Sequence, residues 1–455
     1  MAFPLCQPIT RDQYKQLCQH ASAQSDFVYL GSQAATGGRG AARGFSCQAV
    51  EQIIVESAPE TFVDTVALAR KMEILADPYR LEPTHTEPSP CPLIGGWLGN
   101  IAYEFGYARE PRLNPLMSEQ RFPLFFAGLY LWVASEDLED GQHYLWVHPQ
   151  LPAAQQVQLT DWLQSPDAKQ PAGSGWAITQ DFQPTQNPDA FRERVGRVRE
   201  YIQAGDCYQA NLSQSFEGRF QGDPWAAFSA LSHANPTPYA AFIRHQGTAL
   251  VSVSPERFLA IQDHVIETSP IKGTRARGKT PQQDDALAQE LLASEKDRAE
   301  NLMIVDLLRN DLSVNATPGS VKVDKLFALE SYRNVHHLVS HIRATLKPGV
   351  SPVQALFDAF PGGSITGAPK IRAMEIIRQL EPHWRGPYCG SVFYYGLDGR
   401  LDSSIAIRTL LCEADGAIRC WGGGGIVADS DPEAEYQETL AKVQPLMRFL
   451  EDFKI

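Results

Sequence analysis

The sequence predicts an α+β fold in which most strands pair antiparallel. Five short strand patterns follow one another between residues 208 and 268 with tight turns between them, and short strands joined by tight turns favour antiparallel pairing. Longer helical patterns lie on either side of this run, at 189–204, 281–310 and 432–453. With 455 residues, the chain is long enough for two or three ordinary domains or for one large fold.

We expect three regions along the chain. Residues 1–164 predict mixed strands and short helices, with a clear strand pattern at Phe125–Val133. Residues 165–187 are rich in Pro, Gly, Ser, Gln and Asp, a composition typical of a linker. Residues 188–450 contain most of the helix and strand patterns. We therefore predict that this third region is the main folded domain.

Composition narrows the class of protein. The net charge is -13, and without a run of Lys or Arg we expect neither a nucleic acid nor a membrane as partner. The eight cysteines form no CxxC pair, so neither a zinc ribbon nor a redox motif is indicated. No secretory signal and no bilayer-spanning pattern is present, so we expect a cytoplasmic enzyme with reduced thiols.

Two acidic pairs stand at helical spacing. Asp297 and Glu300 are three residues apart, as are Glu435 and Glu438, so each pair shares one helix face. Four carboxylates that converge from two helices would suit Mg²⁺, which prefers oxygen ligands. The alternative is that both pairs lie on solvated faces, with Lys442 merely pairing with Glu438.

A lysine ends an apolar strand pattern in the segment Ser269–Thr274. If its neighbours shield Lys272 from water, desolvation lowers the pKa of its amine and makes it a candidate nucleophile. From this segment alone, the alternative is a surface lysine that closes a hairpin.

Two glycine-rich segments suggest close approach of the main chain to a ligand. Phe360–Lys370 has the glycine spacing of a phosphate loop, but Ala368-Pro369-Lys370 replaces the Lys-Ser/Thr that such a loop needs. What remains is a turn into a helix N-terminus that favours a carboxylate, or an ordinary helix start. Gly422–Gly425 could admit a ligand to the backbone or form a flexible turn.

Three further side chains are candidates for chemistry. Arg408 is a cation inside an apolar strand pattern, so it needs an internal acid or an anionic ligand. Glu256 follows a strand and could act as a general acid if burial raises its pKa, or could be a solvated turn residue. His337 precedes an apolar pair and could equally be a satisfied core residue.

Taken together, these segments resemble the chorismate-binding enzymes, a family that includes anthranilate synthases, aminodeoxychorismate synthases, isochorismate synthases and salicylate synthases. The resemblance is dense over residues 188–447 and looser over residues 1–160. It rests on these segments, which occur in the family's order: Ser254–Phe258, Ile271–Thr274, Lys296–Leu302, Pro361–Lys370, Ile407–Thr409, Gly425–Ser430 and Glu435–Thr439.

The resemblance implies a large fold of the anthranilate-synthase type, with packed, mainly antiparallel sheets at the centre and helices outside. It also implies Mg²⁺ as cofactor and chorismate as substrate. Glu300 and Glu438 would hold the metal ion, and Asp297 and Glu435 would ligate it directly or through water. Glu256 would protonate the departing hydroxyl. The other implied positions are His337 beside that hydroxyl, Arg408, Gly423, Gly425 and Lys442 for the carboxylates, and Gly273, Thr274 and Thr366 along the ring.

Lys272 distinguishes the branches of this family. Anthranilate and salicylate synthases typically have Ala before the Gly-Thr, whereas the branch that aminates chorismate at C4 resembles this chain in having Lys. In that branch the lysine attacks C2 while the C4 hydroxyl leaves, and ammonia then displaces the lysine. Gln209 stands where the water-adding branch has a lysine base. The resemblance therefore implies formation of 4-amino-4-deoxychorismate for folate biosynthesis. The alternatives are anthranilate synthesis and a non-catalytic chorismate-binding module.

The resemblance also implies partners. No Gly-x-Cys-x-Gly segment is present to release ammonia from glutamine, so we expect a separate glutamine amidotransferase subunit, unless free ammonium suffices. In some relatives the N-terminal part binds tryptophan. The positions that match this site are Ser32, Pro238, Tyr239 and Ala240, although Gly37–Gly40 departs from the pattern.

Overall fold

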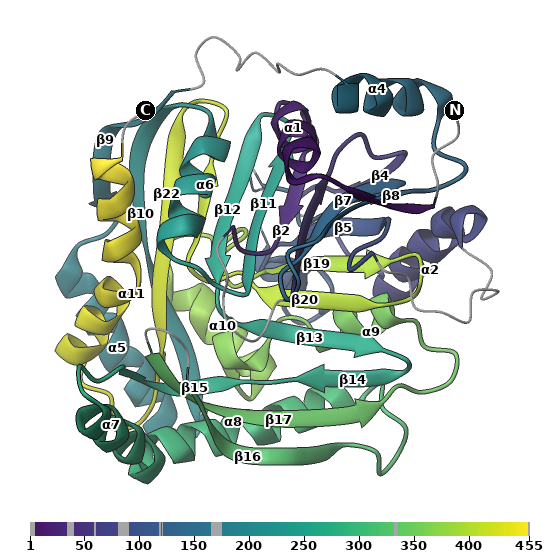
Figure 1. Cartoon of the computed structure of the whole chain (residues 1–455). Coiled ribbons are helices and arrows are strands. Elements are labelled where there is room, and N and C mark those ends of the chain that lie inside the picture. Colours follow the sequence, from purple (N-terminus) through teal and green to yellow (C-terminus); the bar gives the residue numbers. More distant parts are fainter. Residues whose placement is uncertain are drawn as a thin grey trace.

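Two large antiparallel sheets form the centre of the protein, and helices cover them (Figure 1). The computed structural model describes residues 5–33, 41–58, 61–80, 91–117, 120, 122–164, 175–331 and 335–453. The strand ladders of the described residues pair antiparallel, as the tight turns of the sequence predict. The prediction of an α+β fold is confirmed.

The first sheet has twelve strands. In spatial order they are β1 (Cys6–Ile9), β8 (His143–Val147), β7 (Trp132–Asp137), β3 (Ala42–Ser46), β2 (Val28–Leu30), β11 (Tyr239–His245), β12 (Thr248–Ser254), β21 (Thr409–Cys412), β22 (Ala417–Ile426), β10 (Gln209–Gly222) and β18 (Gly367–Ala368), with β9 (Trp176–Pro184) also paired to β10.

The second sheet has ten strands. In spatial order they are β15 (Ile271–Ala276), β17 (Val335–Thr345), β14 (Val265–Thr268), β13 (Arg257–Gln262), β20 (Leu401–Ile405), β19 (Ser391–Gly396), β5 (Gly96–Ile101), β6 (Phe125–Tyr130) and β4 (Glu51–Val55), with β16 (Lys322–Ser331) paired to β17.

Helices enclose the sheets (Figure 1). Their bounds are α1 (Arg11–Ser22), α2 (Thr65–Ala76), α3 (Phe105–Ala108), α4 (Ala153–Gln164), α5 (Pro188–Gln203), α6 (Pro224–Ala234), α7 (Pro281–Ala293), α8 (Glu295–Ser313), α9 (Pro352–Ala359), α10 (Lys370–Leu380) and α11 (Pro432–Asp452), with short 3₁₀ turns η1 (Asp77–Tyr79), η2 (Asn114–Leu116) and η3 (Gly363–Ile365). None of the described helices has the length and apolarity needed to cross a lipid bilayer.

Capping side chains set the ends of the helices around the site. Thr280 caps α7 before Pro281, and its hydroxyl accepts a hydrogen bond from the Gln283 amide. Ser294 ends α7 and begins α8, because its hydroxyl accepts from the Asp297 amide. Asp431 caps α11 in the same way. The helical pattern predicted at 281–310 is thus divided into two helices at Ser294, and this cap fixes the position of Asp297 on the first turn of α8.

Two predicted elements differ in the structure. The strand pattern at Ser404–Cys412 is divided between β20 in one sheet and β21 in the other. Arg408 lies between them with a φ of 52°, in the left-handed region, where the chain crosses from sheet to sheet. Arg408 is therefore not inside a strand. Gly422–Gly425 forms no turn either, since these residues belong to β22.

The three regions of the sequence interleave in space. Of the segment predicted as a linker, residues 165–174 lie outside the described residues, and Trp176–Pro184 forms β9. The first sheet contains strands from both sides of this segment, and so does the second. One apolar core joins both regions, since it includes Trp132 and Leu410.

The cysteines differ from the expected fully reduced state. Cys6 and Cys91 form a disulfide bond that links β1 to the segment before β5. The other six cysteines are free thiols, five of them buried. The expectation that all thiols are reduced is therefore wrong for this pair. Because 85 residues separate the two cysteines, no local spacing in the sequence could indicate that they meet.

Candidate active site

A cavity of about 600 Å³ lies where strands of both sheets meet α8 and α11. All but one of the residues predicted for catalysis, chorismate and metal line it: Glu256, Lys272, Gly273, Thr274, Asp297, Glu300, His337, Arg408, Gly423, Gly425, Glu435, Glu438 and Lys442. Thr366 is the exception. It is fully buried, and its hydroxyl donates to the Gly362 carbonyl at 2.9 Å, so it supports the turn behind the cavity.

The four predicted metal ligands form an acidic wall from two helices. Asp297 and Glu300 are on α8, and Glu435 and Glu438 are on α11. A Cβ atom on Gly424 would lie 3.4 Å from Glu435 Oε2 and 3.5 Å from Glu438 Oε1. The two carboxylates of α11 therefore converge over the backbone of β22.

The charges of this wall are unequal. Burial raises the pKa of Glu300 against the pull of Lys272 and Lys296. Burial also raises the pKa of Glu435, although the Ser430 hydroxyl donates to it at 2.6 Å. For Glu438, the Lys442 amine at 2.7 Å outweighs burial and lowers the pKa. A cation among these groups would relieve the repulsion that burial strengthens.

This donor set fits a magnesium ion. Mg²⁺ is bound through carboxylates together with ligand oxygens and water, and all four carboxylates face one cavity. Within the described part of the chain, no three ligating side chains already form a metal cluster. Instead, Arg275 lies 3.2 Å from Asp297, and Lys442 pairs with Glu438. These two cations occupy carboxylates that a metal ion would need.

Lys272 faces these acids from β15. Its side chain is half-buried and lines the cavity, and it is the foremost positive neighbour of both Glu256 and Glu300. Among the residues whose side chains the structure describes, none forms a hydrogen bond or ion pair with the Lys272 amine, which leaves the nitrogen available to a ligand. Across the ladder, Thr274 faces His337, with 2.9 Å between Thr274 Oγ1 and His337 Nδ1.

Glu256 is a buried carboxyl that also lines the cavity. The Ser364 hydroxyl donates to its Oε1 at 3.0 Å. Burial raises the pKa of Glu256 despite the nearby charges of Lys272, Lys442 and Arg408. A raised pKa favours the protonated form of the carboxyl, which is the form that acts as a general acid.

Arg408 places a positive charge at the wall of the cavity. Its side chain is exposed, and the surface that it exposes lines the cavity. Desolvation by the surrounding protein lowers the pKa of its guanidinium, although the nearby Glu256 acts in the opposite direction. It retains its charge, because an arginine stays protonated under all ordinary conditions. Its position in the crossing between β20 and β21 gives a ligand access to it that a strand interior would not.

The cavity is also lined by residues that the sequence did not single out. Among them are Asn211 of β10, Arg275 of β15 and Tyr388 before β19. Alternation along β10 places Gln209, Asn211 and Ser213 on one face. This alternation could have indicated that Asn211 shares a face with Gln209. The sequence could not indicate that β22 is the neighbouring strand.

A second cavity, of about 640 Å³, lies between the sheets near β2 and β11. Three residues of the predicted tryptophan site line it, Pro238, Tyr239 and Ala240. Ser32 is buried one residue beyond Gly31, which also lines it, and its carbonyl accepts from Arg43. The segment Gly37–Gly40 lies outside the described residues. Tryptophan binding here stays a prediction.

The fold is α+β, and its cavity combines carboxylates from two helices with the cations Lys272, Arg408 and Lys442. The chain belongs to the chorismate binding enzyme family, whose model matches residues 26–448. It is similar to aminodeoxychorismate synthase component 1 of Escherichia coli (strain K12), with 43% identity over 403 residues, or 88% of this chain and 86% of the relative. The Salmonella typhimurium protein of the same name is 43% identical over 85% of this chain and 84% of its own.

A solved structure confirms the fold. Anthranilate synthase component I from Streptococcus pneumoniae TIGR4 matches with a TM-score of 0.75 and 27% identity, over 91% of this chain and 93% of that chain. The predicted anthranilate-synthase-type architecture is therefore confirmed.

Proposed function

We propose that this protein aminates chorismate at C4 and forms 4-amino-4-deoxychorismate, a precursor of para-aminobenzoate and folate. One observation supports this choice above all: Lys272 lines the same cavity as the four carboxylates and Glu256. The relatives from E. coli and S. typhimurium, named for aminodeoxychorismate synthase, support it independently.

The chemistry needs a nucleophile and an acid on the same ring. In its unprotonated form, the Lys272 amine forms a bond to C2, the two conjugated ring double bonds each shift by one position, and the C4–oxygen bond breaks. Glu256 gives its proton to the leaving oxygen, so water departs. Ammonia then forms the C4–nitrogen bond and the C2–lysine bond breaks. A proton from the new C4 ammonium restores Glu256.

The remaining residues bind and orient the substrate. We assign the carboxylates of chorismate to Arg408 and Lys442, and to the backbone of Gly423 and Gly425. Thr274 holds the ring of His337 beside the departing hydroxyl. Glu300 and Glu438, with Asp297 and Glu435, would hold Mg²⁺. When bound, the ion neutralises substrate carboxylate and draws electrons from the ring.

The ammonia would come from a separate glutamine amidotransferase subunit. The words "component 1" in the names of the relatives support a second component. Among the described cysteines, none stands in the Gly-x-Cys-x-Gly context of a glutaminase nucleophile, which supports the same assignment.

The test is Lys272→Ala, assayed with chorismate, Mg²⁺ and ammonium, with products identified by mass. We expect formation of 4-amino-4-deoxychorismate to fall by at least about 1,000-fold. Lys279→Ala is the matched control, because this exposed lysine follows the same strand outside the cavity. Without ammonium, the wild-type chain should gain the mass of chorismate minus water.

Three outcomes would contradict the proposal. Unchanged amination by Lys272→Ala would remove the covalent role of this lysine. Anthranilate and pyruvate as the wild-type products would assign the chain to anthranilate synthesis. No consumption of chorismate under any of these conditions would indicate a binding module.

A further inference from the structure

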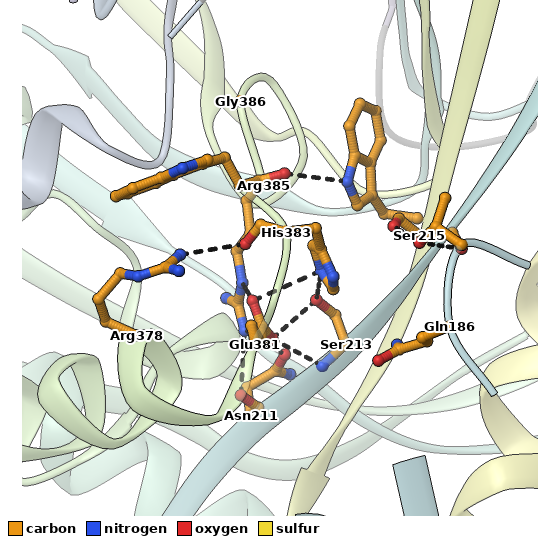
Figure 2. A network of polar contacts seen from close by, with 12 residues as sticks. Gln186, Asn211, Ser213, Ser215, Arg378, Glu381, His383, Arg385 and Gly386 are labelled. Atoms are coloured by element: carbon orange, nitrogen blue, oxygen red, sulfur yellow. Dashed lines mark hydrogen bonds and ion pairs between the residues drawn. The ribbon is translucent and has the colours of Figure 1, made fainter. Parts of the chain in front are cut away.

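A buried ion pair lies directly behind the cavity, beside β10 (Figure 2). Arg385 Nη2 is 2.7 Å from Glu381 Oε1, and Arg385 Nε donates to Glu381 Oε2 at 2.9 Å. Both side chains are almost fully buried, at 1% and 2% exposure. Arg385 outweighs burial and lowers the pKa of Glu381, so the pair stays charged. Such a pair is costly to bury, and its partners indicate its role.

The pair fills a gap in the sheet. On the side of β10 that faces away from β22, β18 pairs with Gln209 and Ala210, and β9 pairs from Phe216 onward. Between them, the Asn211 carbonyl accepts from Arg385 Nη2 at 3.0 Å, and the Ser213 amide donates to Glu381 Oε1 at 2.7 Å. The two side chains thus satisfy backbone groups that a neighbouring strand would otherwise satisfy.

The same guanidinium also sets the orientation of one side chain in the cavity. Arg385 Nη2 lies 3.4 Å from Asn211 Oδ1. Because a guanidinium has donors and no acceptor, the oxygen of the Asn211 amide must face Arg385, and the Nδ2 group points away from it. Figure 2 shows Asn211 beside Arg385 and Glu381. Among the described residues, none accepts a hydrogen bond from Asn211 Nδ2.

Asn211 is in a position to touch the substrate. It lines the cavity and is only 7% exposed. It lies directly opposite Gly425 in the β10–β22 ladder, and opposed residues share one face of a sheet. Gly425 has no side chain, and the Gln209 amide nitrogen, 2.6 Å from where a Cβ on Gly425 would lie, takes the space beside it. Arg408 and Lys442 attract an anionic ligand by charge. A neutral hydrogen-bond donor at Asn211 would orient that ligand without adding charge to the cavity.

We propose that Asn211 contacts the substrate, with Nδ2 donating a hydrogen bond to an anionic oxygen of the dicarboxylate, and that Arg385 and Glu381 position Asn211 for this contact. The identity of the dicarboxylate rests on the proposed function. Arg385 and Glu381 touch no substrate themselves. They act through the orientation of the Asn211 amide and through the backbone on either side of it.

Binding of chorismate with Mg²⁺ and without ammonium, measured by calorimetry, tests the contact; every variant is made in the Lys272→Ala protein, which cannot form the covalent adduct and serves as the wild-type reference. Asn211→Ala should weaken binding about 10-fold, the loss of one hydrogen bond to a charged acceptor. Asn211→Asp should weaken it about 100-fold, because a carboxylate replaces the donor and repels the ligand. Asn100→Ala is the matched control, a buried strand asparagine that does not line the cavity, and it should bind within about 2-fold of wild type.

A double-mutant cycle tests the positioning role. Arg385→Lys keeps the charge but loses the planar fork, and it should weaken binding about 5-fold in the wild-type background. In the Asn211→Ala background the same change should have an effect below about 2-fold, because the amide it orients is gone. If Arg385→Lys does not fold, Glu381→Gln replaces it in the cycle.

Three results would overturn the proposal. Unchanged binding by Asn211→Ala removes the contact. A smaller loss for Asn211→Asp than for Asn211→Ala excludes an anionic acceptor. Additive effects in the cycle make Arg385 a structural residue only. None of these readouts depends on the product formed, so failure of the amination proposal would show separately, as a different product or none from the wild type.

Discussion

The two strand walls of the cavity are built differently. The β10–β22 wall pairs without interruption from Ala210 and Ile426 to Arg219 and Ala417. It is largely buried around the glycines, and the Arg385–Glu381 pair completes its open side. On the other wall, β15 pairs only with β17 among the described strands, with a register shift between Ile271 and Thr274. Its residues are half-buried or exposed.

In the mechanism that we propose, this difference separates binding from bond making. Groups that hold a rigid substrate gain from a wall that cannot move, since misplacement by about 1 Å can cost about 100-fold in rate. A lysine that forms and later breaks a bond to carbon needs some freedom, which an edge strand provides. Lys272 is on the looser wall, and Asn211, Gly423 and Gly425 are on the rigid one.

The rigid wall should be the more sensitive to loss of a charge. Glu381→Ala leaves Arg385 buried without its partner, and we expect a loss of about 3–5 kcal/mol in the free energy of unfolding. Urea denaturation measures it. Glu433→Ala is the control, since this exposed residue pairs with Arg192 at the surface, and its unfolding midpoint should not change. Equal midpoints for the two variants would mean that the pair does not stabilise the wall.

The same wall should make stability depend on pH. Glu104 accepts hydrogen bonds from the amides of Arg385 and Gly386, and burial raises its pKa from 4.5 to about 7. Because the folded state holds a proton that the unfolded state has released, stability is full below pH 4.5 and falls as the pH rises through 7. The loss amounts to about 3 kcal/mol.

Glu104→Gln removes this titration. The difference in unfolding free energy between variant and wild type should shift by about 3 kcal/mol in favour of the variant between pH 4 and pH 8. Denaturant curves at several pH values measure it. A difference that does not vary with pH would show that Glu104 titrates alike in the folded and unfolded protein.

A substitution in the looser wall should lower the catalytic rate and leave the free energy of unfolding almost unchanged. Asp284 receives hydrogen bonds from Arg277 and the Gly278 amide at the end of β15, and lies 3.0 Å from His336 Nε2. Asp284→Asn should therefore lower kcat about 10-fold with KM for chorismate within about 2-fold, because it loosens the strand of Lys272. Asp306→Asn, on the exposed face of α8, is the control. A fall in melting temperature that explains the whole loss of rate would contradict this reading.

The smallest effect on activity should come from a methyl group added at Gly424, next to the carboxylates of Glu435 and Glu438. A Cβ on Gly424 meets Glu435 and Glu438 at ordinary contact distance, whereas one on Gly423 would lie 2.8 Å from the Leu212 carbonyl. We expect Gly424→Ala to change the Mg²⁺ requirement by less than about 3-fold. Gly423→Ala should unfold at lower denaturant. Magnesium titration and urea curves compare the two, and the reverse order would mean that the glycines serve the metal rather than the packing.

Local signals in the sequence were enough to place the acids. The serine at 294 and the i, i+3 spacing of the carboxylates depend on a few neighbouring residues, and both survive in the fold. The contacts of Arg385 with Asn211 join residues 174 positions apart. The crossing at Arg408 depends on which sheet each flanking strand enters. No local pattern contains that information, so the sequence could not reveal the gap in β10 or the residues that fill it.

The interleaving of the two sheets has a consequence for biosynthesis. β10 pairs with β22, which lies about two hundred residues later in the chain, and β5 pairs with β19, which is also far later in the chain. Non-local pairings of this kind slow folding and leave strand edges uncovered meanwhile. While the ribosome is still synthesising the last fifth of the polypeptide, neither sheet can close. The nascent protein must therefore reach almost its full length before the β10–β22 wall of the cavity exists.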